Sequence, residues 1–432
     1  MPAPPDDARR RALHRQGIHR WSVVSLLCLG VIIGYIDRTN LAIALASPAF
    51  SGFFGLSDSG RGVLNSAFYW AYTLMQIPAG FLVDRFGPRL PLALGVLFWC
   101  GMSGATAAAG SLGQLATLRV LLGVGESALV PAGLHWIRDH VEEQRRGLAV
   151  GIFMSGTKWG PAVSAPLSAW LLARYGWRPM FLILGCGGAV WMLPWLRMTR
   201  PTRDAAHREA QPARVRPPEP PFLSLFRERA LWGTLIGTFC YNYFVFFSLT
   251  WLPAYFVERR HLSLNSMGVY TMFSFAGTGL MAILAGYAAD KMIERGYDAV
   301  NTRRWFTIAG LLAASTEIAG ALAESADVAV FFAVFSMTGL GLATANYWAI
   351  TQTVLPQVGA GRIAGLQNTS LNLAGIVAPI VTGWLKEVSG GYAVPMQAIW
   401  VILIAGVGSY LFLMRPAARV QLAVPRPSGR LA

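Results

Sequence analysis

Charged residues are scarce in this sequence. Only 13% of its 432 residues are Asp, Glu, Lys or Arg, whereas 54% are hydrophobic. Soluble globular domains carry about 25% charged residues. The composition therefore excludes an ordinary soluble domain and indicates a chain that crosses a membrane many times.

Cysteine is also scarce. The four cysteines, Cys28, Cys100, Cys186 and Cys240, all lie within apolar runs, and no two have the spacing of metal ligands. We interpret them as small buried hydrophobic residues. The sequence also lacks a nucleophile–base set and any His/Asp metal spacing. We therefore expect no metal, no cofactor and no enzymatic activity.

Acidic residues are fewer than basic ones, which gives a net charge of +15. A nucleic-acid-binding protein gathers its basic residues in a stripe or patch. Here they fall between the apolar runs, which excludes nucleic acid as a partner. Most lie in one alternate set of connections and in the tails, so the positive-inside rule places both termini in the cytoplasm.

Twelve long apolar runs make up most of the chain. A spanning helix needs about 20 residues, and within hydrocarbon a run of this kind must be helical to satisfy its backbone hydrogen bonds. The runs predict an all-α polytopic membrane protein with twelve transmembrane helices near residues 21–46, 59–83, 89–109, 112–135, 147–172, 177–197, 231–257, 266–289, 303–323, 327–354, 362–385 and 394–415.

A polar, proline-rich stretch separates the first six runs from the last six. The segment GFLVDR at 80–85 also recurs as GYAADK at 286–291, after the corresponding run of the second set. Two pseudo-symmetric halves of this kind are a known transporter plan. We predict a cytoplasmic N-terminal tail at 1–20 without fixed structure, a first half at 21–197, a cytoplasmic linker at 198–230, a second half at 231–415 and a cytoplasmic C-terminal tail at 416–432.

Of the charged residues inside the apolar runs, five stand out: Asp37, Arg38, Arg119, Glu126 and Lys158. Each costs about 2.5–3.5 kcal/mol at the centre of a membrane helix, so such residues usually face a polar pathway. Asp37 and Arg38 are adjacent and diverge by about 100° on a helix. We therefore predict two cross-helix pairs, Asp37 with Arg119 and Arg38 with Glu126. The alternative is a static ion-pair network that only holds two helices together.

These charges suggest a coupling mechanism. Protonation of Glu126 would release Arg38, whose planar fork suits a substrate carboxylate. Lys158 adds a further positive charge, which favours an anionic substrate with a second acidic group. A compensating acid on another helix, such as Glu317, would weaken that interpretation.

Several motifs resemble those of a known family. GFLVDRFGPR (80–89) resembles the loop motif of the major facilitator superfamily, and RVLLGVGES (119–127) resembles its fourth-helix motif. YIDRTNLAIA (35–44) and SAFYWAYTLMQIPAGFLVDRFG (66–87) are similar to its anion:cation symporter family, which includes bacterial carriers of galactonate, glucarate and hexuronates. The resemblance implies the major facilitator fold.

The resemblance also implies roles for individual residues. The proton-coupling set would be Asp37, Glu126, Arg38 and Arg119, and Asp84 would be a cytoplasmic latch, with Arg85 and Arg89 either part of it or simply solvated charges. The chain departs from galactonate carriers in the fifth helix, where Thr157 and Lys158 follow Ser155-Gly156 in place of a glutamine. The predicted substrate-binding residues are Tyr35, Arg38, Tyr72, Thr157, Lys158, Trp348 and Asn368.

We accordingly predict a secondary active transporter of the inner membrane. It would take up a small organic anion, such as a sugar acid or dicarboxylate, together with protons by alternating access, as a monomer driven by the proton gradient. The alternatives are a transporter-like membrane sensor of an organic anion and an anion antiporter.

Overall fold

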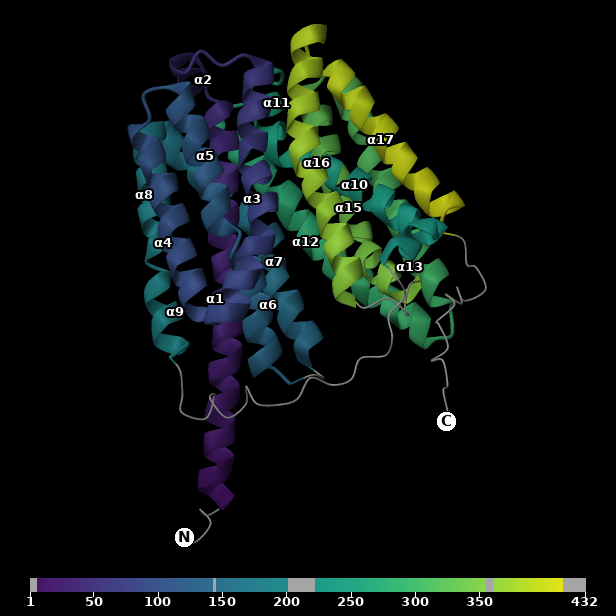
Figure 1. The fold of residues 1–432 in the computed structure, drawn as a ribbon. Helices are drawn as coiled ribbons and strands as arrows, with labels where there is room; N and C mark the ends of the chain where they lie inside the picture. The colour runs from purple at the N-terminus through teal and green to yellow at the C-terminus, as the bar shows by residue number, and fades with distance from the viewer. Residues whose placement is uncertain (1–5, 143–144, 201–221, 355–359, 415–432) are drawn as a thin grey trace. The chain divides into compact units, whose positions relative to one another are not determined.

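The protein is helical throughout the described ranges. The computed structural model describes residues 6–142, 145–200, 222–354 and 360–414 (Figure 1). This confirms the predicted all-α class. In chain order the elements are α1 (Asp6–Leu45), α2 (Pro48–Phe53), α3 (Asp58–Phe86), α4 (Arg89–Ala105), η1 (Thr106–Ala108), α5 (Leu112–Glu126), α6 (Leu129–His140), α7 (Arg146–Tyr175), α8 (Trp177–Ala189), α9 (Met192–Met198), η3 (Phe222–Arg227), α10 (Arg229–Thr250), α11 (Leu252–Glu258), α12 (Leu264–Glu294), α13 (Ala299–Ser315), α14 (Glu317–Leu322), α15 (Ala326–Val354), α16 (Ala360–Ser389) and α17 (Ala393–Phe412).

The helices are those of a multi-pass membrane protein. Among the described residues, 10 helical stretches are long and apolar enough to cross a membrane. The predicted runs at 59–83 and 147–172 correspond to α3 and α7, which fall outside that set. These two helices have 29 and 30 residues, more than the roughly 20 that a span needs.

Several predicted runs are not single helices but two consecutive ones. At three such breaks the second helix has a proline in its first turn: Pro131 in α6, Pro194 in α9 and Pro253 in α11. Proline lacks an N–H and clashes with the preceding turn, so it is tolerated best at a helix start. The break between α5 and α6 leaves Glu126 at the end of α5.

The chain forms two compact units. The first contains Met1–Ala205 and Pro253–Met272, and the second contains Ala206–Leu252 and Phe273–Ala432. In sequence, α11 and the start of α12 follow the predicted linker, yet from Pro253 to Met272 they belong to the first unit. The division into halves at 21–197 and 231–415 stays a prediction.

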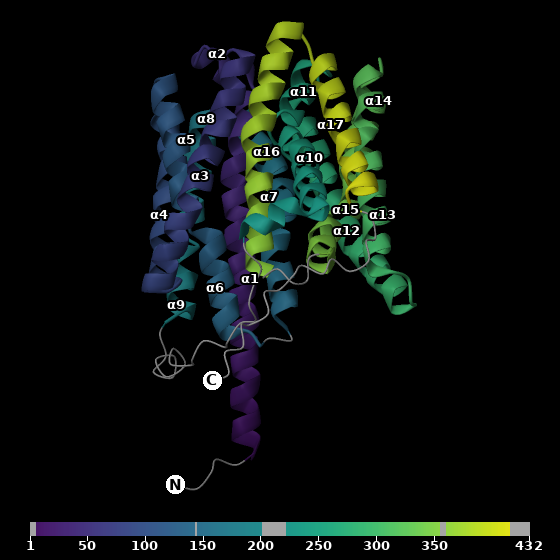
Figure 2. The ribbon, with the colours of Figure 1, turned by 45° about the vertical axis from the view of Figure 1, so that its right-hand side comes forward.

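In the first unit, α1 packs along α7, and α4 lies against α5, α8 and α9 in two views (Figures 1 and 2). Small residues permit the close α1–α7 approach. A Cβ on Gly156 would lie 2.8 Å from the Cys28 carbonyl oxygen, and one on Gly160 would collide with Tyr35. Such small-residue contacts are typical of helix packing in membranes.

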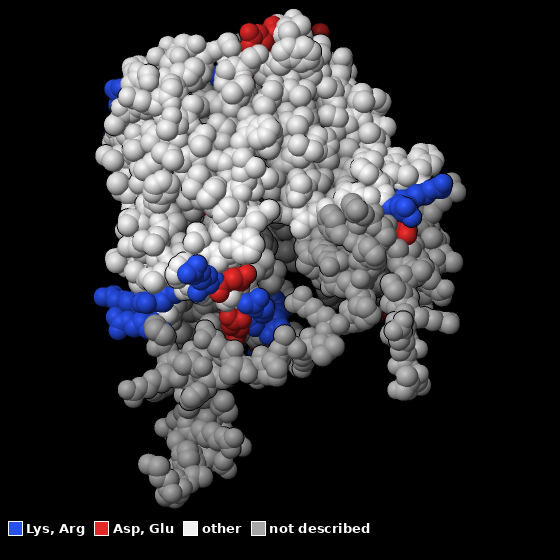
Figure 3. All heavy atoms as spheres, viewed as in Figure 1, with Lys and Arg blue, Asp and Glu red and all other residues white. Residues whose placement is uncertain are grey.

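Charged side chains gather at one end of the first unit on the face that Figure 3 shows. They lie where α3, α6 and α9 end, while the middle of the unit is covered by uncharged residues. This distribution matches an apolar band with a polar rim.

The predicted tails and linker are only partly described. Residues 1–5, most of the linker (201–221) and the C-terminal tail at 416–432 lie outside the described residues. The prediction of an unstructured tail is wrong for residues 6–20, because α1 already begins at Asp6.

Candidate functional site

Arg38 of α1 and Glu126 of α5 form a buried ion pair. The Arg38 Nε and Nη2 atoms both donate to Glu126 Oε1, at 2.8 and 2.5 Å. The two side chains are only 8% and 1% exposed. Gly34 makes room for the carboxylate, because a Cβ there would lie 2.7 Å from Glu126 Oε1. This pair confirms the predicted contact between the two residues.

Aromatic rings surround the Arg38 guanidinium. Its Cζ lies 4.6 Å from the ring centroid of Tyr35 and 4.7 Å from that of Tyr72. Both tyrosines were predicted to line the substrate site, and the structure places them against the arginine. Two rings that the sequence did not single out, Phe68 and Tyr69, lie on the same cation at 4.7 and 5.9 Å.

Asp37 lies in a second polar cluster. Its Oδ1 accepts from Ser103 Oγ of α4 at 2.5 Å and from Asn40 Nδ2 at 3.3 Å. Arg119 Nη1 donates to the main-chain oxygen of Asp37 at 2.9 Å. The predicted second pair is therefore made differently: Arg119 binds the Asp37 backbone, because the Asp37 carboxylate bonds to Ser103 and Asn40 instead.

This cluster is buried yet incompletely hydrogen-bonded. Asp37, Asn40 and Arg119 are at most 1% exposed. Within the described part of the chain, Asp37 Oδ2, Asn40 Oδ1, and Arg119 Nε and Nη2 have no hydrogen-bond partner. A buried polar group without a partner costs about 1–3 kcal/mol. Each such atom in a native structure calls for an explanation, such as a functional role or a bound water.

Thr157 and Lys158 lie in α7, between the two glycines that face α1. Both side chains are partly buried. Their helix, α7, packs along α1, which holds Asp37 and Arg38. Lys158 therefore lies in the same unit as the other four charged residues.

Trp348 and Asn368 belong to the second unit, on α15 and α16. The Trp348 ring lies 5.6 Å from that of Tyr347, and Tyr347 stacks on Tyr241 at 4.4 Å. Both predicted residues are partly buried. Their role in binding stays a prediction.

The predicted gating residues lie at the charged end of the first unit. Asp84, near the end of α3, is 69% exposed and its Oδ1 lies 3.3 Å from His135 Nδ1 of α6. Arg89 begins α4 and donates to the carbonyl of Leu196 in α9 at 3.1 Å. Arg85 is exposed and lies over the Phe86 ring. A gating role for the three stays a prediction.

The family model of the Major Facilitator Superfamily matches residues 27–379, which covers helices of both units. The chain belongs to this superfamily. Its predicted fold and its nature as a multi-pass membrane transporter are thereby confirmed, and the named relatives are transporters, not enzymes.

Two relatives illustrate where this facilitator lies within the superfamily. It is 28% identical over 426 residues to the probable L-galactonate transporter of Escherichia coli (strain K12), covering 96% of this chain and 93% of that protein. It is 29% identical over 432 residues to the probable galactarate/D-glucarate transporter GudP of Bacillus subtilis (strain 168), covering 93% of each. These similarities support the predicted resemblance to anion:cation symporters.

A solved structure supports the fold of this facilitator. The bacterial homolog to the human lysosomal transporter Spinster, in an inward-facing and occupied conformation, has a TM-score of 0.75 and 20% identity to it. The match covers 91% of this chain and 97% of that one. At this identity the likeness shows the fold alone.

Sequence reasoning missed several polar and aromatic partners of the charged residues. Ser103 and Asn40 bind Asp37, and Phe68 and Tyr69 contact Arg38. Phe68, Tyr69 and Tyr72 occupy positions i, i+1 and i+4 of α3, so a search for rings on one helix face could have grouped Phe68 with Tyr72. No local signal marks Ser103.

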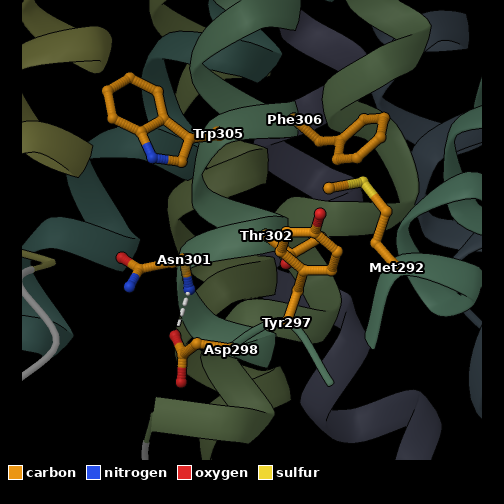
Figure 4. Close-up of a pocket in the computed structure, with 7 residues that line it drawn as sticks. All are labelled: Met292, Tyr297, Asp298, Asn301, Thr302, Trp305 and Phe306. Carbon is orange, nitrogen blue, oxygen red and sulfur yellow. Dashed lines mark hydrogen bonds between the residues drawn. The ribbon is translucent and has the colours of Figure 1, made fainter. Parts of the chain in front are cut away.

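A cavity of about 340 Å³ lies in the second unit, at the connection between α12 and α13 (Figure 4). Its one acid, Asp298, caps α13 by accepting from the main-chain N–H of Asn301 at 2.8 Å. No predicted site residue lines it, so we give it no part in transport. Its lining residues are Met292, Tyr297, Asp298, Asn301, Thr302, Trp305 and Phe306.

Proposed function

We propose that this facilitator takes up a small organic anion together with protons by alternating access. The anion is a sugar acid or a related mono- or dicarboxylate, the class named for its galactonate and galactarate/glucarate relatives. The proton gradient supplies the energy, and no cofactor takes part. The protein acts as a monomer in the inner membrane with both termini in the cytoplasm, as the distribution of basic residues suggests.

One observation carries the coupling proposal. Both Arg38 donors converge on a single oxygen of Glu126, while Oε2 of the same carboxylate is buried without a partner among the described residues. Oε2 is therefore the oxygen on which a proton can be added without displacing a hydrogen bond. The added proton removes the negative charge that holds Arg38.

The protonation state of Glu126 determines how strongly Arg38 attracts an anionic substrate. With Glu126 ionised, the Arg38 guanidinium is neutralised by its partner and attracts an anion weakly. With Glu126 protonated, the same guanidinium is a buried cation that lacks a counter-ion, and a substrate carboxylate can take that place with its own two oxygens. Proton and anion then bind together and are released together.

The remaining charges support the substrate class. Asp37 is buried among Ser103, Asn40 and Arg119 and is the second candidate proton site. Lys158 on α7 supplies a cation for a second acidic group of the substrate. Trp348 and Asn368, on helices of the second unit, remain predicted substrate-binding residues.

The test is uptake by the purified protein in liposomes with an imposed pH gradient. The probes are D-galactonate, D-glucarate and D-glucuronate. We expect one or more to accumulate, and Glu126→Gln to lose accumulation while still exchanging labelled for unlabelled substrate. Accumulation by Glu126→Gln would contradict the role of Glu126. Binding of a probe without net flux would instead identify a sensor, and obligatory exchange an antiporter.

A further inference from the structure

Four aromatic rings hold the Arg38 guanidinium. The Arg38 Cζ lies 4.6 Å from the ring centroid of Tyr35, 4.7 Å from those of Phe68 and Tyr72, and 5.9 Å from that of Tyr69. All four distances are within the roughly 6 Å over which a ring face attracts a cation. We refer to these four residues as the aromatic box.

The rings of α3 are fixed by packing that does not involve Glu126. Phe68, Tyr69 and Tyr72 are 4%, 3% and 5% exposed. Phe68 packs edge-on against Tyr69 at 5.0 Å and stacks with Tyr72 at 5.4 Å. Their helix is held close to α5, since a Cβ on Gly123 would collide with the Phe68 carbonyl oxygen. These three rings of the box are therefore held in place without Glu126.

We propose that the aromatic box keeps Arg38 in place when Glu126 is protonated, with Phe68 as a positioning residue. The inference rests on the proposed function and extends it. A ring carries no net charge, so it stabilises the guanidinium without neutralising it, unlike Glu126. The cation stays where a carboxylate can reach it, and its Nη1, which bonds to neither Glu126 oxygen, is available to that carboxylate.

The expected effect follows from the strength of a single ring. A cation–π contact contributes about 1–2 kcal/mol when it is shielded from water, which corresponds to roughly 5- to 30-fold in an equilibrium constant. Removing the Phe68 ring should therefore shift the equilibrium between Arg38 inside and outside the box by that factor. The tyrosine hydroxyls should matter less than the rings.

The decisive experiment measures how fast phenylglyoxal modifies Arg38 in the purified full chain, read by mass spectrometry. Glu126→Gln mimics the protonated acid. We expect its Arg38 to react within about threefold of wild type, because the box still holds the guanidinium in place, and Glu126→Gln with Phe68→Leu to react roughly tenfold faster. The matched control is Glu126→Gln with Phe153→Leu, since Phe153 is a fully buried ring of α7.

The proposal is overturned if Glu126→Gln alone exposes Arg38 as fully as the double variant does. It is also overturned if adding Phe68→Leu to Glu126→Gln does not increase the modification rate of Arg38, or if adding Phe153→Leu increases that rate equally. None of these readouts requires a transported substrate. Failure of all probes to accumulate would therefore reject the proposed function, while the labelling still decides the role of the box.

Uptake provides a second readout that a structural defect would not mimic. For D-glucarate we expect Phe68→Leu to raise KM roughly 5- to 30-fold with the maximal rate per reconstituted protein nearly unchanged. Phe153→Leu, which removes a fully buried ring of α7, should leave KM within about threefold of wild type. An equal KM increase in Phe153→Leu would show that the loss of any buried ring weakens uptake, and it would contradict the role of Phe68.

Discussion

Arg61 and Glu258 are 197 residues apart in the chain, yet Arg61 Nη1 lies 2.6 Å from Glu258 Oε1. The same guanidinium contacts Asp58 Oδ1 at 3.1 Å and donates to the carbonyl of Leu45, the last residue of α1. One buried arginine thus joins the start of α3, the end of α1 and α11. It is one of the contacts that join the segment Pro253–Met272, which follows the linker, to the rest of the first unit.

Replacing Arg61 should weaken the first unit. In Arg61→Gln we expect the free energy of unfolding to fall by about 1–3 kcal/mol, because a buried acceptor loses its donor while the partly exposed carboxylates are compensated by water. Thermal unfolding of the purified protein measures this effect. Arg259→Gln, an exposed arginine of the same segment, is the control and should melt like wild type. Equal melting temperatures for both variants would contradict the prediction.

Gly34→Ala should separate the buried ion pair. The added Cβ would overlap with Glu126 Oε1, so the carboxylate must move away from Arg38. Overpacking of this kind costs about 1–3 kcal/mol, and we expect proton-driven accumulation to be lost. Gly101→Ala, on α4 with open space around its Cα, should transport normally. The prediction fails if both alanine variants accumulate substrate equally well.

Ser103→Ala should remove a hydrogen bond from the buried Asp37 carboxylate and lower the stability of the protein. The Ser103 hydroxyl donates a hydrogen bond to a carboxylate that has no exposure to water, and losing a bond to a charged group costs about 1.5–3 kcal/mol. We expect a lower melting temperature and a changed pH dependence of uptake. The control is Ser127→Ala, whose hydroxyl donates to the Val124 carbonyl in the last turn of α5. If the pH dependence of uptake is identical to that of wild type, Asp37 takes no part in proton coupling.

Lys158→Gln should weaken the binding of substrates with two acidic groups more than the binding of substrates with one. If Lys158 binds the second group, KM for D-glucarate should rise roughly tenfold while KM for D-galactonate changes less than about threefold. Competition uptake assays with both acids measure the ratio. Arg174→Gln, at the exposed end of the same helix, should leave the ratio unchanged. Equal effects on both acids would remove Lys158 from substrate recognition.

Asp84→Asn should impair transport without impairing insertion. The neutral side chain can no longer attract a cation at the end of α3, and charged hydrogen bonds are about twice as strong as neutral ones. We expect uptake per reconstituted protein to fall by roughly tenfold or more. Asp139→Asn, which removes the other acidic partner of His135, should keep most of its activity. Full uptake by Asp84→Asn would show that this acid is only a solvated charge.

The site charges could be predicted because they are anomalies in an apolar background. An ionised residue inside a membrane-length run is rare enough to stand out without any structure. The divergence of Asp37 from Arg38 also follows from helix geometry, and it correctly separated the partners of the two residues. The pairing of Arg38 with Glu126 then followed from charge and helix position.

The partners of those charges could not be predicted. Ser103, Phe68 and Tyr69 are common residues in apolar helices, and nothing local to them indicates a contact with α1. Their importance depends on how α3 and α4 pack against α1 and α5. The same holds for Arg119, which the sequence assigned to the Asp37 carboxylate and which instead binds the Asp37 main-chain oxygen.

By itself the sequence determined that this chain is a helical membrane protein, roughly where its spans lie, and that Asp37, Arg38, Arg119 and Glu126 lie inside them, because hydropathy and charge act on each segment separately. Only the tertiary structure decided which atoms meet: both Arg38 donors on one oxygen of Glu126, four rings around the guanidinium and Arg61 on Glu258. These contacts depend on ångström-scale distances between helices that are far apart in the chain, and packing, not composition, sets those distances.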